Sequence, residues 1–115
     1  MPPEAKRLVE LLKQLSDGPA EATVRELLSV IESLPDNHLM HPFTELAMAL
    51  RNGLTYEDHW KDVPGTTYAW VAALFEKYLT VPLNDNRLGR AIIQLDDWGI
   101  ETTPFGKDFD WSELE

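Results

Sequence analysis

Residues 67–80, TYAWVAALFEKYLT, decide the fold, because they hold the longest uninterrupted apolar run of this 115-residue chain. Apolar side chains recur there with the 3.6-residue period of a helix. One face carries Tyr68, Val71, Ala72, Phe75, Tyr78 and Leu79. The opposite side holds further apolar residues, and only Glu76 and Lys77 are charged. A helix that is apolar on most sides is covered on most sides, so this stretch is predicted to be the central, most buried helix.

Two more helices are predicted at the amino-terminal end. The first covers residues 3–16 and ends at Asp17-Gly18-Pro19, where Gly18 can adopt a positive φ and Pro19 suits the first turn of the next helix. The second continues the apolar stripe up to Pro35. The two stripes consist of Ala5, Leu8, Val9, Leu12 and Leu15, and of Val24, Leu27, Leu28, Ile31 and Leu34. This spacing predicts two antiparallel helices joined by a tight turn.

A third helix is predicted to start at Pro42 and to stop at Gly53, which has the position of a helix-terminating C′ glycine. Residues 55–58, TYED, fit a capping box with an aspartate in the last position, so a short helical turn is predicted over residues 56–62. Pro64-Gly65 is interpreted as the end of that turn.

The last clear helix is predicted to begin at Asn84 or Asp85 and to reach Trp98. Its inner stripe is formed by Leu88, Ala91, Ile92 and Leu95, and Gly99 would end it. Gly89 lies inside this helix, where glycine costs about 1 kcal/mol relative to alanine. A close crossing with another helix is the explanation that we prefer, and the approach of a partner's backbone is the alternative.

No stretch of the sequence predicts a strand. The expected fold is therefore all-α: a single small, irregular or orthogonal bundle of five to six helices. The bundle should occupy residues 1–100. Residues 101–115 should form an extended, acidic, aromatic carboxy-terminal segment that packs on this domain or projects from it.

Composition argues against several classes of ligand. The chain has 20 acidic and 10 basic residues, a net charge of −10. Nucleic acids and anionic membranes are bound mainly through Lys and Arg, so neither is expected as a ligand. Because the chain has no cysteine, disulfides and thiolate chemistry are excluded. The absence of an apolar signal core or membrane span in the sequence leads us to expect a soluble, cytoplasmic protein.

Candidate catalytic and metal-binding residues are few. His38-x-x-His41 has ligand-like spacing, and Glu45 is near in sequence, but no third His or Cys completes a zinc site. The pair is also expected in the connection before Pro42 and not on a helix face. We therefore expect no bound metal, no cofactor and no catalytic residue. The acidic pairs Glu57/Asp58 and Asp96/Asp97 are adjacent in sequence, so they point apart on a helix and do not converge on one substrate.

The last twenty residues carry the strongest functional signal. They contain seven acids and one base, a net charge of −6, together with four large aromatic residues. Acidic side chains can attract a basic surface, while aromatic rings can anchor it. The predicted partner-binding residues are Asp96, Asp97, Glu101, Phe105, Asp108, Phe109, Asp110, Trp111 and Glu113. The alternative is a packed terminus whose charge serves solubility.

Small, acidic, cysteine-free and helical chains resemble, in general type, the proteins that neutralise basic enzymes. Examples are immunity proteins of nuclease toxins, antitoxins and phage inhibitors of CRISPR-type defence, some of which mimic nucleic acid. This general likeness assigns no role to any particular residue. It implies an inhibitor of a basic enzyme that acts on nucleic acid, with an acidic surface filling a cationic site. Two alternatives remain: a non-catalytic adaptor subunit of a larger assembly, and a small metal-dependent enzyme using His38, His41 and Glu45.

Overall fold

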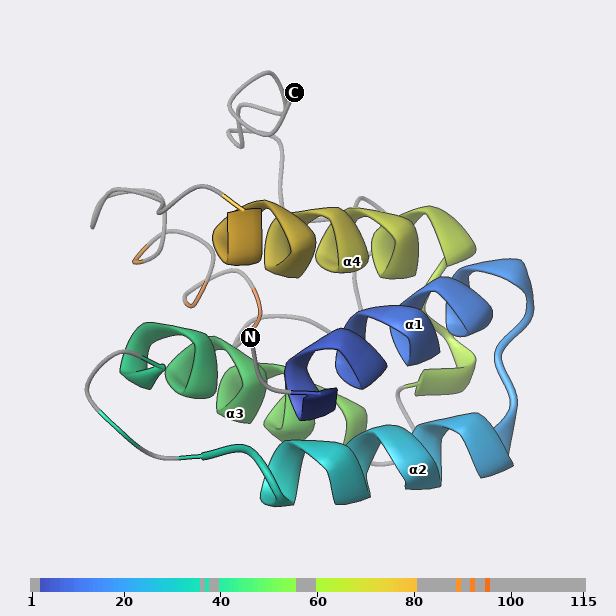
Figure 1. Ribbon diagram of the computed structural model, residues 1–115. Coiled ribbons are helices and arrows are strands. Elements are labelled where there is room, and N and C mark those ends of the chain that lie inside the picture. The colour runs from blue at the N-terminus through green and yellow to red at the C-terminus, as the bar shows by residue number, and fades with distance from the viewer. Residues whose placement is uncertain are drawn as a thin grey trace.

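Four α-helices make up most of the part of the chain that the computed structural model describes, namely residues 3–35, 37, 40–55, 60–80, 89, 92 and 95. They are α1 (Pro3–Asp17), α2 (Glu21–Glu32), α3 (His41–Thr55) and α4 (Gly65–Thr80) (Figure 1). No strand occurs among these residues, which confirms the all-helical prediction. The remaining predicted helices and the carboxy-terminal segment fall largely or wholly outside the described residues. The described residues therefore contain four of the five to six helices that were predicted.

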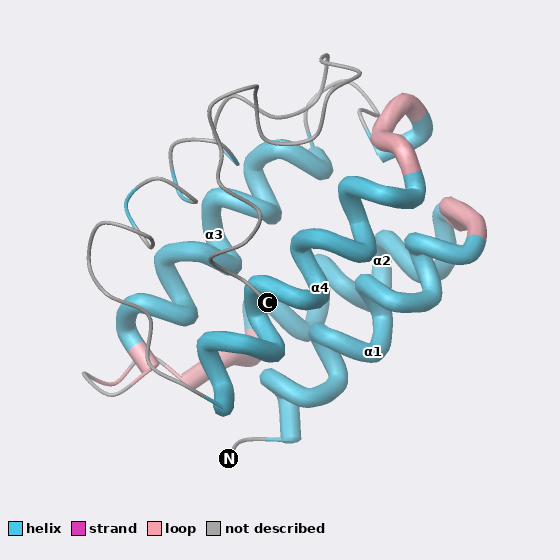
Figure 2. Tube along the Cα trace, turned by 90° about the horizontal axis from the view of Figure 1, so that it is seen from above, coloured by secondary structure: helices cyan, strands magenta, loops and turns pink. Residues whose placement is uncertain are grey.

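Helix α1 lies between α2 and α4, and each neighbour runs antiparallel to it (Figures 1 and 2). Its apolar residues therefore contact both neighbours. Six of its residues are buried: Ala5, Leu8, Val9, Leu11, Leu12 and Leu15. Ion pairs cross the surface on either side, from Arg7 to Glu26 of α2 and from Lys13 to Glu76 of α4. Burial of the leucines supplies most of the stabilisation, because exposed ion pairs contribute little.

Aromatic rings join α3 to α4. The ring centroids of Phe43 and Phe75 are 4.8 Å apart in an edge-to-face arrangement, and Tyr78 lies 5.8 Å from Phe43. Phe43 and Phe75 are fully buried, and Leu95 joins the same core. Helix α4 contributes seven buried residues, as many as α3. Because α1 is the helix with the most extensive contacts, to both α2 and α4, the described residues do not single out α4 as the central, most buried helix.

A buried tyrosine links α4 to the turn before it. Residues 60 and 61 form a 3₁₀ turn, which is the described part of the turn predicted over residues 56–62. The Tyr68 hydroxyl donates a hydrogen bond of 2.8 Å to the Trp60 carbonyl oxygen, so this polar atom is satisfied inside the core. Burial raises the pKa of Tyr68, because the phenolate would be poorly solvated there.

The prediction that Gly53 ends the third helix is wrong. Helix α3 continues to Thr55, and Gly53 and Leu54 are both buried. The burial of Leu54, which is 1% exposed, offsets the cost of a glycine within a helix. The helix also begins one residue earlier than predicted, at His41, so that Pro42 is its second residue. Proline is tolerated there, because the N–H groups of the first turn make no hydrogen bond within the helix and the missing N–H of proline is not needed.

Pro64-Gly65 starts a helix, although the sequence suggested that it ends one. Helix α4 begins at Gly65, two residues before the predicted start. A Cβ atom at Gly65 would lie 2.5 Å from the backbone carbonyl oxygen of Ser16, closer than real Cβ atoms come. Gly65 therefore allows the start of α4 to lie against the end of α1.

Two other glycines differ from their predicted roles. Gly18 donates its N–H to the Gln14 carbonyl oxygen over 3.2 Å, but its φ lies outside the left-handed region. Gly89 is helical and half-buried, and no atom of the described residues lies within 4 Å of a Cβ built there. None of the helices α1–α4 therefore crosses close to Gly89, contrary to the close helix crossing predicted as the explanation for this glycine.

Within the described part of the chain, no helix combines the length and the apolar character needed to cross a membrane.

Candidate functional site

The predicted partner surface lies outside the described residues. This applies to all nine of its members: Asp96, Asp97, Glu101, Phe105, Asp108, Phe109, Asp110, Trp111 and Glu113. The surface stays a prediction from sequence.

His41 does not lie in a connection, as predicted, but is the first residue of α3. Its Nε2 atom is 3.2 Å from Oε1 of Glu45, one helical turn further on. His38 falls outside the described residues, so the three-ligand site of the enzyme alternative stays a prediction. Among the residues that are described, no three His, Asp or Glu side chains come together as a metal site would require.

We therefore expect the purified protein to hold no stoichiometric zinc after dialysis against a weak chelator, since two exposed ligands bind a transition metal weakly. Elemental analysis before and after dialysis measures this. Zinc that survives dialysis and is lost in the His41→Ala variant would contradict the expectation and favour the metal-enzyme alternative.

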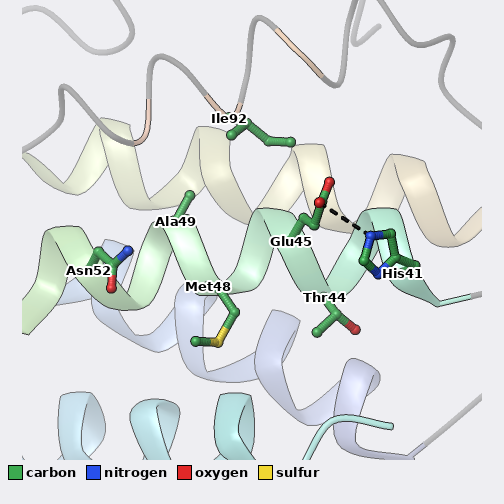
Figure 3. A pocket seen from close by; sticks show the side chains of 7 residues that line it. All are labelled: His41, Thr44, Glu45, Met48, Ala49, Asn52 and Ile92. Atoms are coloured by element: carbon green, nitrogen blue, oxygen red, sulfur yellow. Dashed lines mark ion pairs between the residues drawn. The ribbon is translucent and has the colours of Figure 1, made fainter. Parts of the chain in front are cut away.

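A groove of about 430 Å³ runs along the outer side of α3 (Figure 3). Its described lining residues are His41, Thr44, Glu45, Met48, Ala49, Asn52 and Ile92. We call it the α3 groove. Met48 is 39% exposed and is the one exposed large apolar residue among those described. Ile92 approaches from a distant part of the sequence and is partly buried against the core.

A second, smaller groove of about 230 Å³ lies between α1 and α4. Val9 and Leu79 supply its apolar lining, and its charges balance, with two lysines and two glutamates. Lys13 and Glu76 are already paired across it, with Nζ and Oε2 2.7 Å apart. This groove therefore presents no net charge to a ligand.

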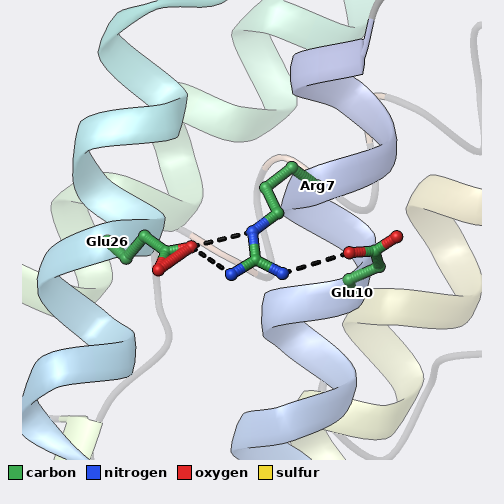
Figure 4. Close-up of polar contacts among 3 residues, drawn as sticks. All are labelled: Arg7, Glu10 and Glu26. Atoms are coloured by element: carbon green, nitrogen blue, oxygen red, sulfur yellow. Dashed lines mark hydrogen bonds and ion pairs between the residues drawn. The ribbon is translucent and has the colours of Figure 1, made fainter.

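Ion pairs compensate much of the charge on the helices. The Arg7 guanidinium lies between two carboxylates, Glu26 on α2 and Glu10 on its own helix (Figure 4). Its hydrogen bonds to Glu26 and then Glu10 raise the pKa of Arg7. Further pairs join Arg25 to Glu21 and Arg51 to Glu32. Arg7, Lys13, Arg25 and Arg51 thus each have an acidic partner among the described residues.

The net charge is distributed unevenly along the chain. The described residues include nine acids and seven bases, a net charge of −2. The remaining residues include eleven acids and three bases, a net charge of −8. Most of the surplus negative charge therefore belongs to the residues around and after the described helices, above all to residues 96–115.

The α3 groove was not predicted from the sequence. One signal was present, because Met48 is a large apolar residue outside the stripe formed by Phe43, Leu46, Ala47 and Leu50. Its neighbour across the groove, Ile92, is 44 positions away in the sequence, and only the folded chain brings the two to the same groove.

No protein-family profile, curated protein or solved structure matches this chain.

Proposed function

We propose that this protein binds and inhibits a basic enzyme, one that acts on nucleic acid, through its acidic aromatic carboxy-terminal segment. The observation that carries the proposal is the uneven distribution of charge. The described helices are almost neutral, whereas residues 96–115 alone have a net charge of −6.

Charge compensation on the helices supports this choice of surface. Arg7, Lys13, Arg25 and Arg51 neutralise acids of the bundle itself, so the bundle offers little field to attract a cationic partner. Unpaired clusters of one sign increase the rate of encounter with an oppositely charged protein. An enzyme that binds nucleic acid displays such a cationic surface, because it must hold phosphates. Carboxylates that occupy this surface compete with the substrate, and the aromatic rings supply apolar contacts that slow dissociation.

A pulldown from the native source tests the class of partner. An inhibitor should recover one basic enzyme in stoichiometric amount, and its addition should abolish that enzyme's activity on nucleic acid. Recovery of a multi-subunit complex with no change in activity would instead favour the adaptor alternative.

The tail charges should act mainly on the association rate. In a variant with Asp108→Asn, Asp110→Asn and Glu113→Gln, we expect association with the captured enzyme to slow about tenfold, with reduced salt dependence. Dissociation should change little, because rim charges contribute mostly to steering. Surface plasmon resonance at several salt concentrations measures both rates.

A matched control changes the same number of charges on the described bundle. Asp17 and Glu21 are exposed on α1 and α2, and Asp62 is exposed in the turn before α4. Together, Asp17→Asn, Glu21→Gln and Asp62→Asn should leave the association rate within about twofold of the parent. A truncation after Thr103 should weaken binding further than the tail variant. The truncated protein must first show the helical circular dichroism of the parent. If that folded truncation bound with the parent's affinity and salt dependence, the tail would not be the partner surface.

A further inference from the structure

The α3 groove combines an apolar wall with one carboxylate. Met48, Ala49 and Ile92 supply the apolar contacts, and His41 and Glu45 are the ionisable residues among its described lining. Figure 3 shows Glu45 toward one end of the groove and Asn52 toward the other. The two are seven residues apart on one helix, which corresponds to about 10 Å along the axis.

This arrangement suits a side chain that is aliphatic along its length and positively charged at its tip. A lysine has a four-carbon stem that packs on apolar surface while its ammonium group stays near water. In the groove, the stem would lie against Met48 and Ala49, and the ammonium would reach Glu45. The described lining of the groove contains the carboxylate of Glu45 and no lysine or arginine, which favours a cation over an anion at this position.

The exposure of the lining residues favours a tethered side chain over a free small molecule. The side chains of His41 and Glu45 are 58% and 56% exposed, and Met48 is 39% exposed. Sites for free small ligands usually enclose most of the ligand surface. An open groove covers one side of a group that another protein holds in place.

We propose that the α3 groove receives a lysine side chain of a basic protein partner. The identity of the partner as a basic protein rests on the proposed function, but the groove is a separate surface from the carboxy-terminal segment. Glu45 binds the ammonium group, and His41 positions the Glu45 carboxylate from one turn before it.

Methionine methyl groups give a direct test on the full chain. The protein has three methionines, Met1, Met40 and Met48, and only Met48 belongs to the groove lining. With ¹³C-methyl-methionine, rising concentrations of the probe Nα-acetyl-lysine methylamide should shift the Met48 signal progressively. The probe should bind weakly, because an open groove covers only one side of an untethered side chain. The Met40 signal should stay in place, since that residue packs against the core outside the groove. Nα-acetyl-norleucine methylamide, which has an aliphatic side chain without the charge, should bind several-fold more weakly.

Two variants locate the charge. Glu45→Gln should weaken the lysine probe by up to about fivefold, the effect of an exposed ion pair. Glu21→Gln, an exposed glutamate of α2 that pairs with Arg25, removes the same charge elsewhere and should leave the affinity unchanged. The proposal is overturned if Met48 does not respond, if norleucine binds as well as lysine, or if both variants behave alike. Because this titration needs no partner, a negative result would overturn the role of the α3 groove alone. The proposed inhibitor function would still be tested by the pulldown and by the binding of the tail variants.

Discussion

Replacing Phe75 with alanine should lower the free energy of unfolding by about 3–5 kcal/mol. Phe75 is fully buried, and its ring meets Phe43 edge to face at 4.8 Å. The substitution removes apolar burial and the ring contact, and it leaves a cavity where the aromatic rings join α3 to α4. Urea denaturation followed by circular dichroism measures the loss.

The neighbouring residue provides the control. Glu76→Ala removes an exposed side chain and its ion pair with Lys13, so it should cost less than about 1 kcal/mol. If Phe75→Ala melted within about a degree of the parent, the place of α4 in the core would be wrong, because such a cavity shifts the melting temperature far more.

Replacing Gly65 with alanine should lower the free energy of unfolding by about 1–3 kcal/mol, the usual cost of an overpacked site. The added methyl would lie 2.5 Å from the Ser16 carbonyl oxygen. That oxygen belongs to the backbone of α1 and cannot rotate away as a flexible side chain could. The two helices must therefore separate at this end, which also weakens the contacts that follow along them.

Gly89→Ala is the matched control, because no described residue lies within 4 Å of a Cβ at that helical position. It should raise the free energy of unfolding by about 0.5–1 kcal/mol, since alanine is the better helix former. The same denaturation experiment compares the two variants. A Gly65→Ala protein as stable as the Gly89→Ala protein would contradict the close approach of α4 to α1.

Helix α1 could be predicted from sequence to within one residue, because it has a regular apolar stripe and clear turn residues after it. Helix α2 was predicted less closely: Pro19 lies before it and not in its first turn, and it ends at Glu32, three residues before Pro35. The glycines were harder. Gly53 continues a helix, Gly65 starts one, and Gly89 has no described residue against its Cβ position. Glycine tolerates all of these settings, so its role depends on neighbours that are distant in sequence.

The same limit applies to the candidate sites. The ion pairs between helices join residues far apart in sequence, 19 positions for Arg7–Glu26 and Arg51–Glu32, and 63 for Lys13–Glu76. Local patterns predict which residues are charged but not which of them are neutralised in the fold. The acidic carboxy-terminal segment was found because its signal is local composition, and its role as a partner surface stays a prediction.

The position of α1 between α2 and α4 has a consequence during synthesis. The ribosome completes α1 and α2 by residue 32, but the other neighbour of α1 is not finished until residue 80. At ordinary elongation rates these 48 residues take about 2–10 s. For that interval the side of α1 that packs against α4 in the finished fold stays uncovered. During this period the exposed apolar surface could bind a chaperone, or a second nascent chain on the same mRNA.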